Sequence, residues 1–301
     1  MQAAAQDSEF YMVIAFLWMG LSGVTFGTDD QILDSRIRPL LDAHKGKTAV
    51  AVKHLETGES YRVRADVPMP TASLIKFPVM IETFRQAAEK KTDLNAPVTL
   101  KKEDKVPGAG ILTPHFSPGA SFPLRDAVHL MIVYSDNTAT NLVLDRIGIG
   151  STAKTMEQMG FPNTKIHSKV FKRETSVFPE RSKEFGLGST TADDMVALFE
   201  KLHKGELVSK EACEAMKKSL MQCDDKDKFP RFLPPGSKVA FKTGSVDAAK
   251  TAAGILYTKS GPVALCVLTA ENDDKRWVAD NAGNLLCAKI AKEVWERFGK
   301  K

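Results

Sequence analysis

This chain of 301 residues lacks most of the short motifs by which enzymes are commonly identified. It has no GxSxG turn, no P-loop and no HExxH motif, and its six histidines are never four residues apart, so a histidine-dependent triad has no support. Its four cysteines form no CxxC pair and have no histidine at metal-ligand spacing, which argues against zinc. The 42 Lys and Arg against 37 Asp and Glu give a formal charge of +5 without the dense basic stripe of nucleic-acid-binding proteins. We therefore expect no metal, no cofactor and no nucleic acid.

Two of the cysteines have apolar surroundings in the sequence. Cys266 lies in the run PVALCVLTA, and Cys287 shares a predicted helical face with Ala291 and Val294. Both are expected to be buried as small hydrophobic residues. In an exported protein they could instead oxidise to a disulfide with each other, and that alternative stays open at this point.

An uncharged apolar segment lies close to the N-terminus. Residues 10–27 resemble the apolar core of a secretory signal, although the residues before them hold Asp7 and Glu9 and no Lys or Arg. We expect an exported protein, periplasmic or extracellular, in which residues 1–27 form a signal-like leader or a membrane tether. No cysteine stands directly after the apolar segment, which argues against a lipid anchor.

Strand patterns occur near both ends of the chain, and helical patterns fill the middle. The expected elements are a helix over 31–44, strands over 48–55 and 60–64, a mostly helical stretch over 71–207, strands over 238–245, 253–258 and 262–269, and a last helix over 277–298.

This order predicts an α/β (α+β) sandwich, in which an antiparallel sheet is flanked by the N- and C-terminal helices and an all-helical lobe is inserted. We expect residues 28–301 to form one domain, with its α/β lobe at about 28–68 and 210–301 and its helical lobe at about 69–209. We expect the protein to be a monomer. A crevice between a sheet edge and a helical lobe is a common place for a binding site.

The first residues that could carry chemistry stand where a loop runs into an apolar helix. In Ser73-Leu74-Ile75-Lys76 the serine and the lysine are three residues apart, so on a helix the Lys76 amine can reach the Ser73 hydroxyl. Serine needs a base to become a good nucleophile, and lysine acts as one only where burial or positive neighbours lower its pKa. The ordinary alternative is a capping serine followed by a surface lysine.

A second motif, Ser135-Asp136-Asn137, stands between two apolar helical runs. Asp and Asn are ordinary N-cap residues at such a place. In a functional interpretation, the Ser135 hydroxyl relays a proton towards a leaving nitrogen, and the Asn137 amide holds a substrate carbonyl.

A third motif, Lys242-Thr243-Gly244 followed by Ser245, lies on a predicted strand. A lysine there either guards an exposed sheet edge against aggregation or, with small residues after it, binds an anionic substrate.

Together and in this order, SxxK, SDN and KTG resemble the motif set of class A β-lactamases and penicillin-binding serine acyltransferases. The spacings agree as well, since Ser73 precedes Ser135 by 62 residues and Ser135 precedes Lys242 by 107. The resemblance covers about residues 28–301. It implies that Ser73 is the acylated nucleophile, that Lys76 is its proton partner and that Ser135 is the proton shuttle.

The same resemblance implies the groups that hold the substrate. Asn137, Lys242, Thr243 and Ser245 would bind its amide and carboxylate, and the backbone N–H groups of Ser73 and Ser245 would form an oxyanion hole. Two alanines stand near the end of the stretch after KTG, where many relatives carry Arg or Asp, so the carboxylate is expected to draw on Lys250 or on Lys275-Arg276 instead.

Deacylation separates a lactamase from a penicillin-binding protein, because it needs a carboxylate that activates water on the acyl-enzyme. Class A enzymes use a Glu in an ExxLN context. The best match here is Glu174, with Val177 in the place of the Leu and Phe178 in the place of the Asn. Glu180 and Glu184 lie on the same loop as further candidates.

The leading hypothesis is a class A-like serine β-lactamase that hydrolyses the amide bond of a small-molecule β-lactam. The alternative is a penicillin-binding D-Ala-D-Ala peptidase or related serine esterase, which would act on acyl-D-Ala-D-Ala-like substrates and release β-lactams slowly. A third hypothesis, a non-catalytic binding module, conflicts with the intact Ser73, Lys76, Ser135 and Lys242.

Overall fold

A computed structural model describes residues 31–299 of the chain. Its centre is a five-stranded antiparallel sheet with the strand order β2-β1-β10-β9-β8. The strands are β1 (Lys47–His54), β2 (Ser60–Val63), β8 (Val239–Val246), β9 (Ala249–Thr258) and β10 (Gly261–Ala270). Strands from the two ends of the chain pair directly, with Lys47 opposite Ala270 and His54 opposite Val263. The predicted antiparallel sheet is therefore confirmed. The leader expected at residues 1–27 lies outside the described residues.

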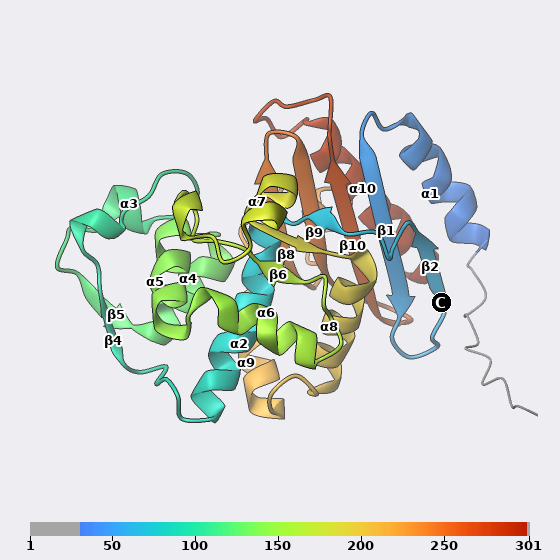
Figure 1. The fold of residues 1–301 in the computed structure, drawn as a ribbon. Helices are drawn as coiled ribbons and strands as arrows, with labels where there is room; N and C mark the ends of the chain where they lie inside the picture. Colours follow the sequence, from blue (N-terminus) through green and yellow to red (C-terminus); the bar gives the residue numbers. More distant parts are fainter. Residues whose placement is uncertain (1–30, 300–301) are drawn as a thin grey trace, which may run out of the picture.

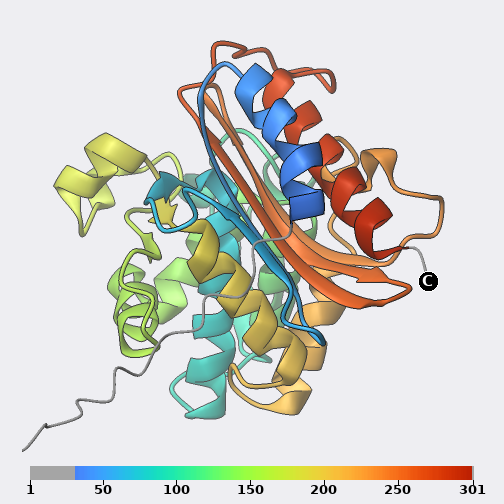
Figure 2. The same ribbon diagram turned by 90° about the vertical axis from the view of Figure 1, so that its right-hand side faces the viewer.

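Two helices from opposite ends of the chain cover one face of this sheet (Figures 1 and 2). They are α1 (Gln31–Ala43), which contains Pro39, and α10 (Ala282–Phe298). The sequence predicted that the last helix begins at Trp277, but it begins at Ala282. The Asn281 side chain accepts hydrogen bonds from the N–H groups of Gly283 and Asn284 and so caps the helix there.

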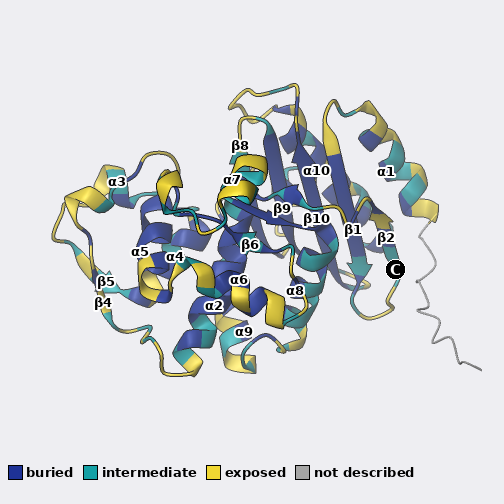
Figure 3. Cartoon of the chain, in the orientation of Figure 1, coloured by how far each residue is buried: buried dark blue, intermediate teal, exposed yellow. Residues whose placement is uncertain are grey.

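Helices from the middle of the chain cover the opposite face. The main ones are α2 (Lys76–Ala88), α4 (Leu124–Val133), α5 (Asn137–Ile147), α6 (Ile149–Gln158), α8 (Ala192–Lys204) and α9 (Lys210–Leu220). Helix α8 packs against β1 and β10, while α2 packs among α4, α5, α6 and α9. Helix α2 is buried along its whole first half, from Lys76 to Thr83. Figure 3 shows this burial in the strands and the central helices, with exposed residues at α7 and the outer loops.

Short elements complete the fold. They are β3 (Met69–Pro70), η1 (Ala72–Ile75), β4 (Pro97–Thr99), η2 (Lys102–Asp104), α3 (Leu112–His115), β5 (Ser121–Pro123), β6 (Lys165–Ile166), η3 (Arg173–Thr175), α7 (Pro179–Phe185), β7 (Gly188–Thr190) and η4 (Phe229–Phe232). Strands β3, β7 and β6 form a small second sheet, and β4 pairs with β5. Within residues 31–299, no helix is long and apolar enough to cross a membrane.

The sheet separates two hydrophobic cores, and Cys266 and Cys287 lie in different ones. Side chains alternate along β10, so Cys266 joins the core under the helical side, while Cys287 on α10 joins the core on the other face. Both thiols are free and buried. The expectation of buried hydrophobic cysteines is confirmed, and the alternative of a Cys266–Cys287 disulfide is wrong because the sheet lies between the two residues.

Candidate active site

A cavity of about 1100 Å³ lies where the sheet edge at β8 faces the helical side of the molecule. Its walls come from η1, from the turn between α4 and α5, from β8, and from loops around residues 108–111, 168–173 and 223–227. Six of the residues singled out in the sequence line it: Ser73, Ser135, Asn137, Lys242, Thr243 and Ser245. Residues from three motifs far apart in the sequence therefore meet at one site.

Ser73 stands on η1, the short turn that leads into α2. The residue before it, Ala72, has a φ of +46°, which is rare for a residue with a side chain and costs free energy. Neighbouring segments hold this turn in place, because Thr71 N–H donates to Gly188 O at 3.0 Å and the Thr251 hydroxyl donates to Thr71 O at 2.8 Å. The fold thus fixes the backbone that carries the Ser73 hydroxyl.

Lys76 is wholly buried, although the ordinary interpretation of its motif is a surface lysine. Its Nζ donates to Ser135 O at 2.6 Å and to Asn137 Oδ1 at 2.8 Å, and it lies 3.3 Å from Ser135 Oγ. The expected Lys76–Ser73 hydrogen bond is not among those of residues 31–299. Burial lowers the pKa of Lys76 well below its usual value, and the nearby charge of Lys242 lowers it further, so both favour the neutral amine over the charged form.

Ser135 and Asn137 are held by the residue between them. Asp136 caps α5 by accepting from Ala139 N–H at 2.8 Å, and its other carboxyl oxygen accepts from the N–H groups of the loop at residues 111 and 112. A Cβ at Gly110, whose φ is +121°, would stand 2.3 Å from the Asp136 carboxyl carbon, so this approach requires glycine. The N-cap interpretation of the motif is right for Asp136, and the cap serves to orient its two neighbours.

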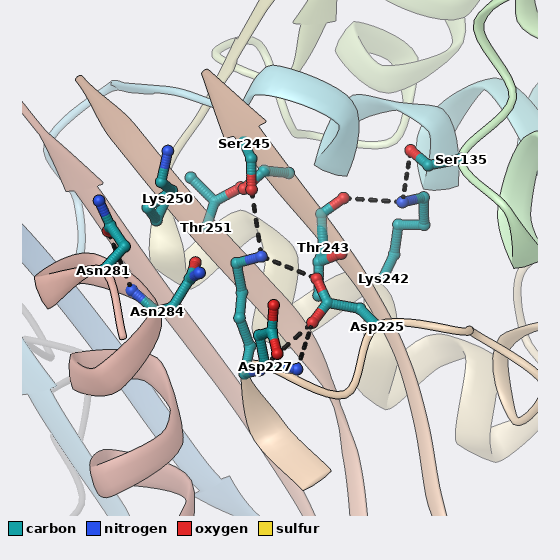
Figure 4. A network of polar contacts seen from close by, with 12 residues as sticks. Ser135, Asp225, Asp227, Lys242, Thr243, Ser245, Lys250, Thr251, Asn281 and Asn284 are labelled. Atoms are coloured by element: carbon teal, nitrogen blue, oxygen red, sulfur yellow. Dashed lines mark hydrogen bonds and ion pairs between the residues drawn. The ribbon is translucent and has the colours of Figure 1, made fainter. Parts of the chain in front are cut away.

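Lys242 is also wholly buried, so it is no edge lysine guarding against aggregation, although β8 is an edge strand. Its Nζ donates to Ser135 Oγ at 3.1 Å and to Thr243 O at 2.7 Å, as Figure 4 shows. Burial lowers the pKa of Lys242. The Ser135 hydroxyl consequently lies between two buried amines, one on the helical side and one on the sheet.

Strand β8 also approaches η1 closely. A Cβ at Gly244 would stand 2.3 Å from Thr71 O and 2.8 Å from Leu74 N, so only glycine lets the strand lie this near to Ser73. This approach places the backbone of Ser245 on the same cavity wall as the nucleophile.

The sequence analysis missed a buried ion pair behind this strand. Lys228 is 2% exposed, and its Nζ lies 2.7 Å from Asp225 Oδ2 and 3.1 Å from Ser245 Oγ. Asp225 also accepts a hydrogen bond from the Thr243 side chain. Burial alone would raise the pKa of Asp225, but the charge and hydrogen bond of Lys228 lower it overall. The run DDKDK looks like a solvated charged loop, and nothing in its spacing distinguishes the two residues that turn inward.

The structure does not bring the predicted deacylating carboxylate to the cavity. Glu174 lies on η3 with an exposed side chain, and no glutamate is among the cavity-lining residues of the described chain. Glu180 pairs with Lys183 on the surface, and Glu184 is exposed as well. The residues of this loop that do line the cavity include Arg173, directly before Glu174, and Val170, which is 7% exposed.

The residues expected to assist carboxylate binding lie elsewhere. Lys250 is buried, donates to Val246 O at 2.7 Å and lies under the Trp277 ring. Arg276 is paired with Asp274 at 2.9 Å on the surface, and Lys275 is exposed. None of the three expected cations is among the residues that line the cavity, whereas Val246 and Trp277 are.

Comparison with known proteins agrees with this architecture. The model of the β-lactamase enzyme family matches residues 32–298. A β-lactamase of Streptomyces cellulosae is 27% identical over 242 residues, which cover 78% of this chain and 75% of that protein. A β-lactamase structure from Sphaerobacter thermophilus superposes with a TM-score of 0.78 and 26% identity, over 90% of this chain and 98% of that one. A PBP-A variant, solved as an acyl-enzyme complex with penicillin G, gives a TM-score of 0.77 and 22% identity over 90% and 97% of the two chains.

The family match spans nearly all of the described residues, and the three motifs lie within it. The predicted superfamily and fold class are confirmed, and with them a hydrolase that acts on β-lactams. This chain belongs to the β-lactamase enzyme family.

Proposed function

We propose that the protein opens β-lactams by forming an acyl-enzyme on Ser73, with the catalytic arrangement of a class A-like serine β-lactamase. The Ser73 Oγ attacks the lactam carbonyl and its proton passes to the neutral Lys76 amine. As the C–N bond breaks, Ser135 gives its proton to the departing nitrogen and receives one from Lys76. The ester on Ser73 and a protonated ring nitrogen are the balanced products of this step.

The observation that carries the proposal is the pair of buried lysines that meet at Ser135. Lys76 approaches its hydroxyl from the helical side at 3.3 Å, and Lys242 donates to it from the sheet at 3.1 Å. The lowered pKa of the buried Lys76 favours the neutral amine, which can accept a proton, whereas a surface lysine keeps its charge. A hydroxyl in contact with both amines is well placed to pass its proton to the departing nitrogen and to receive one from Lys76.

The substrate is proposed to lie with its carboxylate towards Lys242, Thr243 and Ser245 and its side-chain amide at Asn137. The Asn137 Oδ1 is occupied by Lys76, and its Nδ2 donates to Pro107 O at 3.0 Å. An amide nitrogen has two N–H groups, so one of them can donate to a substrate carbonyl. The backbone N–H groups of Ser73 and Ser245 would bind the oxyanion, a contribution on the order of 3 kcal/mol to the barrier for each donor.

A second candidate function follows from the absence of glutamate from the lining of the described cavity. The protein would then acylate like a lactamase but release the product slowly, as in the penicillin-binding alternative, with acyl-D-Ala-D-Ala-like compounds as substrates. Supporting it are the exposed Glu174 and the apolar Val170 on the wall. The two candidates share every acylation step and differ only in how a water is activated.

The test of the proposed function compares benzylpenicillin hydrolysis by residues 28–301 and by the Ser73→Ala variant. Product formation that depends on Ser73 supports the lactamase, with a surface change such as Lys183→Ala as the control. A covalent adduct without multiple turnovers supports the slow-release candidate. Undiminished hydrolysis by Ser73→Ala would refute both.

The remaining proposals concern the whole chain. We propose that the apolar segment at residues 10–27 directs export of the protein. We also propose that the protein is a monomer and that its two lobes have the boundaries given above. Mass measurement of protein recovered from the medium or periplasm tests cleavage near residue 27, and light scattering tests the monomer. A tether that is not cleaved would instead leave the intact chain in the membrane fraction.

A further inference from the structure

Phe171 stands at the cavity in a conformation that is unfavourable for its own side chain and backbone. Its side chain is 65% exposed although it lines the same cavity as Ser73. Its φ is +57°, the left-handed region, which is an outlier for a bulky side chain. Burial of the ring would stabilise the fold, and a glycine would suit the backbone better. Such a residue persists where surrounding structure imposes it, and these places cluster at ligand sites.

The surrounding structure does impose this conformation. Asn141 on α5 makes two hydrogen bonds to the backbone of Val170, the residue before Phe171. Its Oδ1 accepts from Val170 N–H at 2.8 Å, and its Nδ2 donates to Val170 O at 3.0 Å. The Lys172 N–H donates back to Lys169 O at 3.3 Å and closes a tight turn with Val170 and Phe171 at its tip. The turn thus holds the phenyl ring at the cavity before any substrate arrives.

The ring lies beside the amide that is proposed to hold the substrate. A Cβ added at Gly108 would meet Phe171 Cε2 at 3.2 Å and Asn137 Nδ2 at 2.8 Å, so both side chains border the same point. Gly108 has a φ of +88° and lacks the atom that would push them apart. Asn137 and Phe171 therefore form neighbouring parts of the cavity wall.

We infer that Phe171 is a specificity-determining residue that binds an aromatic or other large apolar acyl side chain of the substrate. The inference rests on the proposed function, because it takes its orientation from the carboxylate at Lys242 and the side-chain amide at Asn137. The group attached to that amide carbonyl then continues past Asn137 and reaches the ring. The backbone that carries the ring is held in place, and the exposed ring gains contact area and an aromatic pairing when a substrate group packs against it.

The test compares two penicillins that differ only in this group. Benzylpenicillin carries a phenylacetyl side chain, whereas the analogue with a plain acetyl side chain keeps the amide and the ring carboxylate. The measurement is the second-order rate constant of acylation, read from intact-protein mass, so that slow deacylation does not affect it. The Phe171→Gly variant suits the left-handed backbone. In it we expect the acylation rate constant for benzylpenicillin to fall about fivefold to twentyfold, and that for the acetyl analogue to change less than twofold.

Controls separate recognition from damage to the loop. Phe171→Tyr should keep most of the preference for benzylpenicillin, and Phe232→Ala, at a partly exposed phenylalanine outside the cavity lining, should leave both rates unchanged. The melting temperature of Phe171→Gly should not fall. An equal loss for both penicillins, or no loss for either, would overturn the inference while leaving the proposed function intact. If the parent protein forms no adduct with either penicillin, the proposed function itself fails, and the inference with it.

Discussion

Replacing Lys228 by methionine should destabilise the protein far more than removing a matched surface ion pair. Lys228 and Asp225 are three residues apart with 2.7 Å between their charged atoms, and their side chains are 3% and 20% exposed. Breaking a fully buried pair typically costs about 3–5 kcal/mol, because one charge is left without a partner. Since Asp225 keeps some contact with water, we expect about 2–4 kcal/mol for Lys228→Met.

The chain offers a close control for this prediction. Lys183 and Glu180 are also three residues apart at 2.8 Å, but their side chains are 71% and 84% exposed. Lys183→Met should therefore cost no more than about 0.5 kcal/mol. Thermal unfolding measures both: at roughly 2–4 °C per kcal/mol, Lys228→Met should lower the melting temperature by about 5–15 °C.

A double-mutant cycle shows whether the loss comes from the pair. Adding Asp225→Asn to Lys228→Met removes the unpaired carboxylate, so the double variant should be at least about 1 kcal/mol more stable than the sum of the single variants predicts. Benzylpenicillin acylation should also slow in Lys228→Met, because Ser245 loses a hydrogen bond at 3.1 Å. Equal melting temperatures for Lys228→Met and Lys183→Met, or strict additivity in the cycle, would refute the reasoning.

Three further outcomes are expected at the site. The positive charge of Lys242 lowers the pKa of Lys76, so Lys242→Ala should raise that pKa. The acidic limb of the acylation pH profile should then move to higher pH, because Lys76 must lose its proton to act as a base. A limb that stays in place would contradict this coupling. Glu174→Gln should change the acyl-enzyme lifetime less than twofold, because its side chain is exposed and outside the cavity lining, and a tenfold longer lifetime would return the water-activating role to it. Val170→Glu adds a carboxylate to the wall and should shorten that lifetime at least tenfold, whereas the uncharged Val170→Gln should not.

The elements most readily predicted from the sequence were those with a strong period or a short turn. The strand patterns near both ends of the chain and the hairpin between β1 and β2 predicted the antiparallel sheet. The uninterrupted apolar run of β10 fits a strand that is buried on both faces. The start of α10 was placed too early, since the segment before Ala282 has no repeating pattern and the cap at Asn281 decides the boundary.

The candidate site was predicted as far as its motifs extend. Ser73, Ser135 and Lys242 meet as expected, but their motifs do not reveal that Lys76 bonds to Ser135 and Asn137. The expectation for Glu174 relied on a partial motif match, and local sequence does not determine which residue of a loop faces inward.

Other residues at the site give no local signal at all. The inward turn of Lys228 and the left-handed Phe171 are set by contacts from distant segments: Ser245 on β8 and Asn141 through Val170.

The most direct test of the account is the mass of residues 28–301 followed over time after mixing with a slight excess of benzylpenicillin. We predict an adduct of one penicillin per chain that maps to Ser73 and never forms in Ser73→Ala. Its disappearance within seconds to minutes, as penicilloate accumulates, identifies the lactamase, and its persistence for hours identifies the slow-release candidate. A parent protein that stays unmodified while no penicilloate forms, or an adduct on another residue, would contradict the central claim.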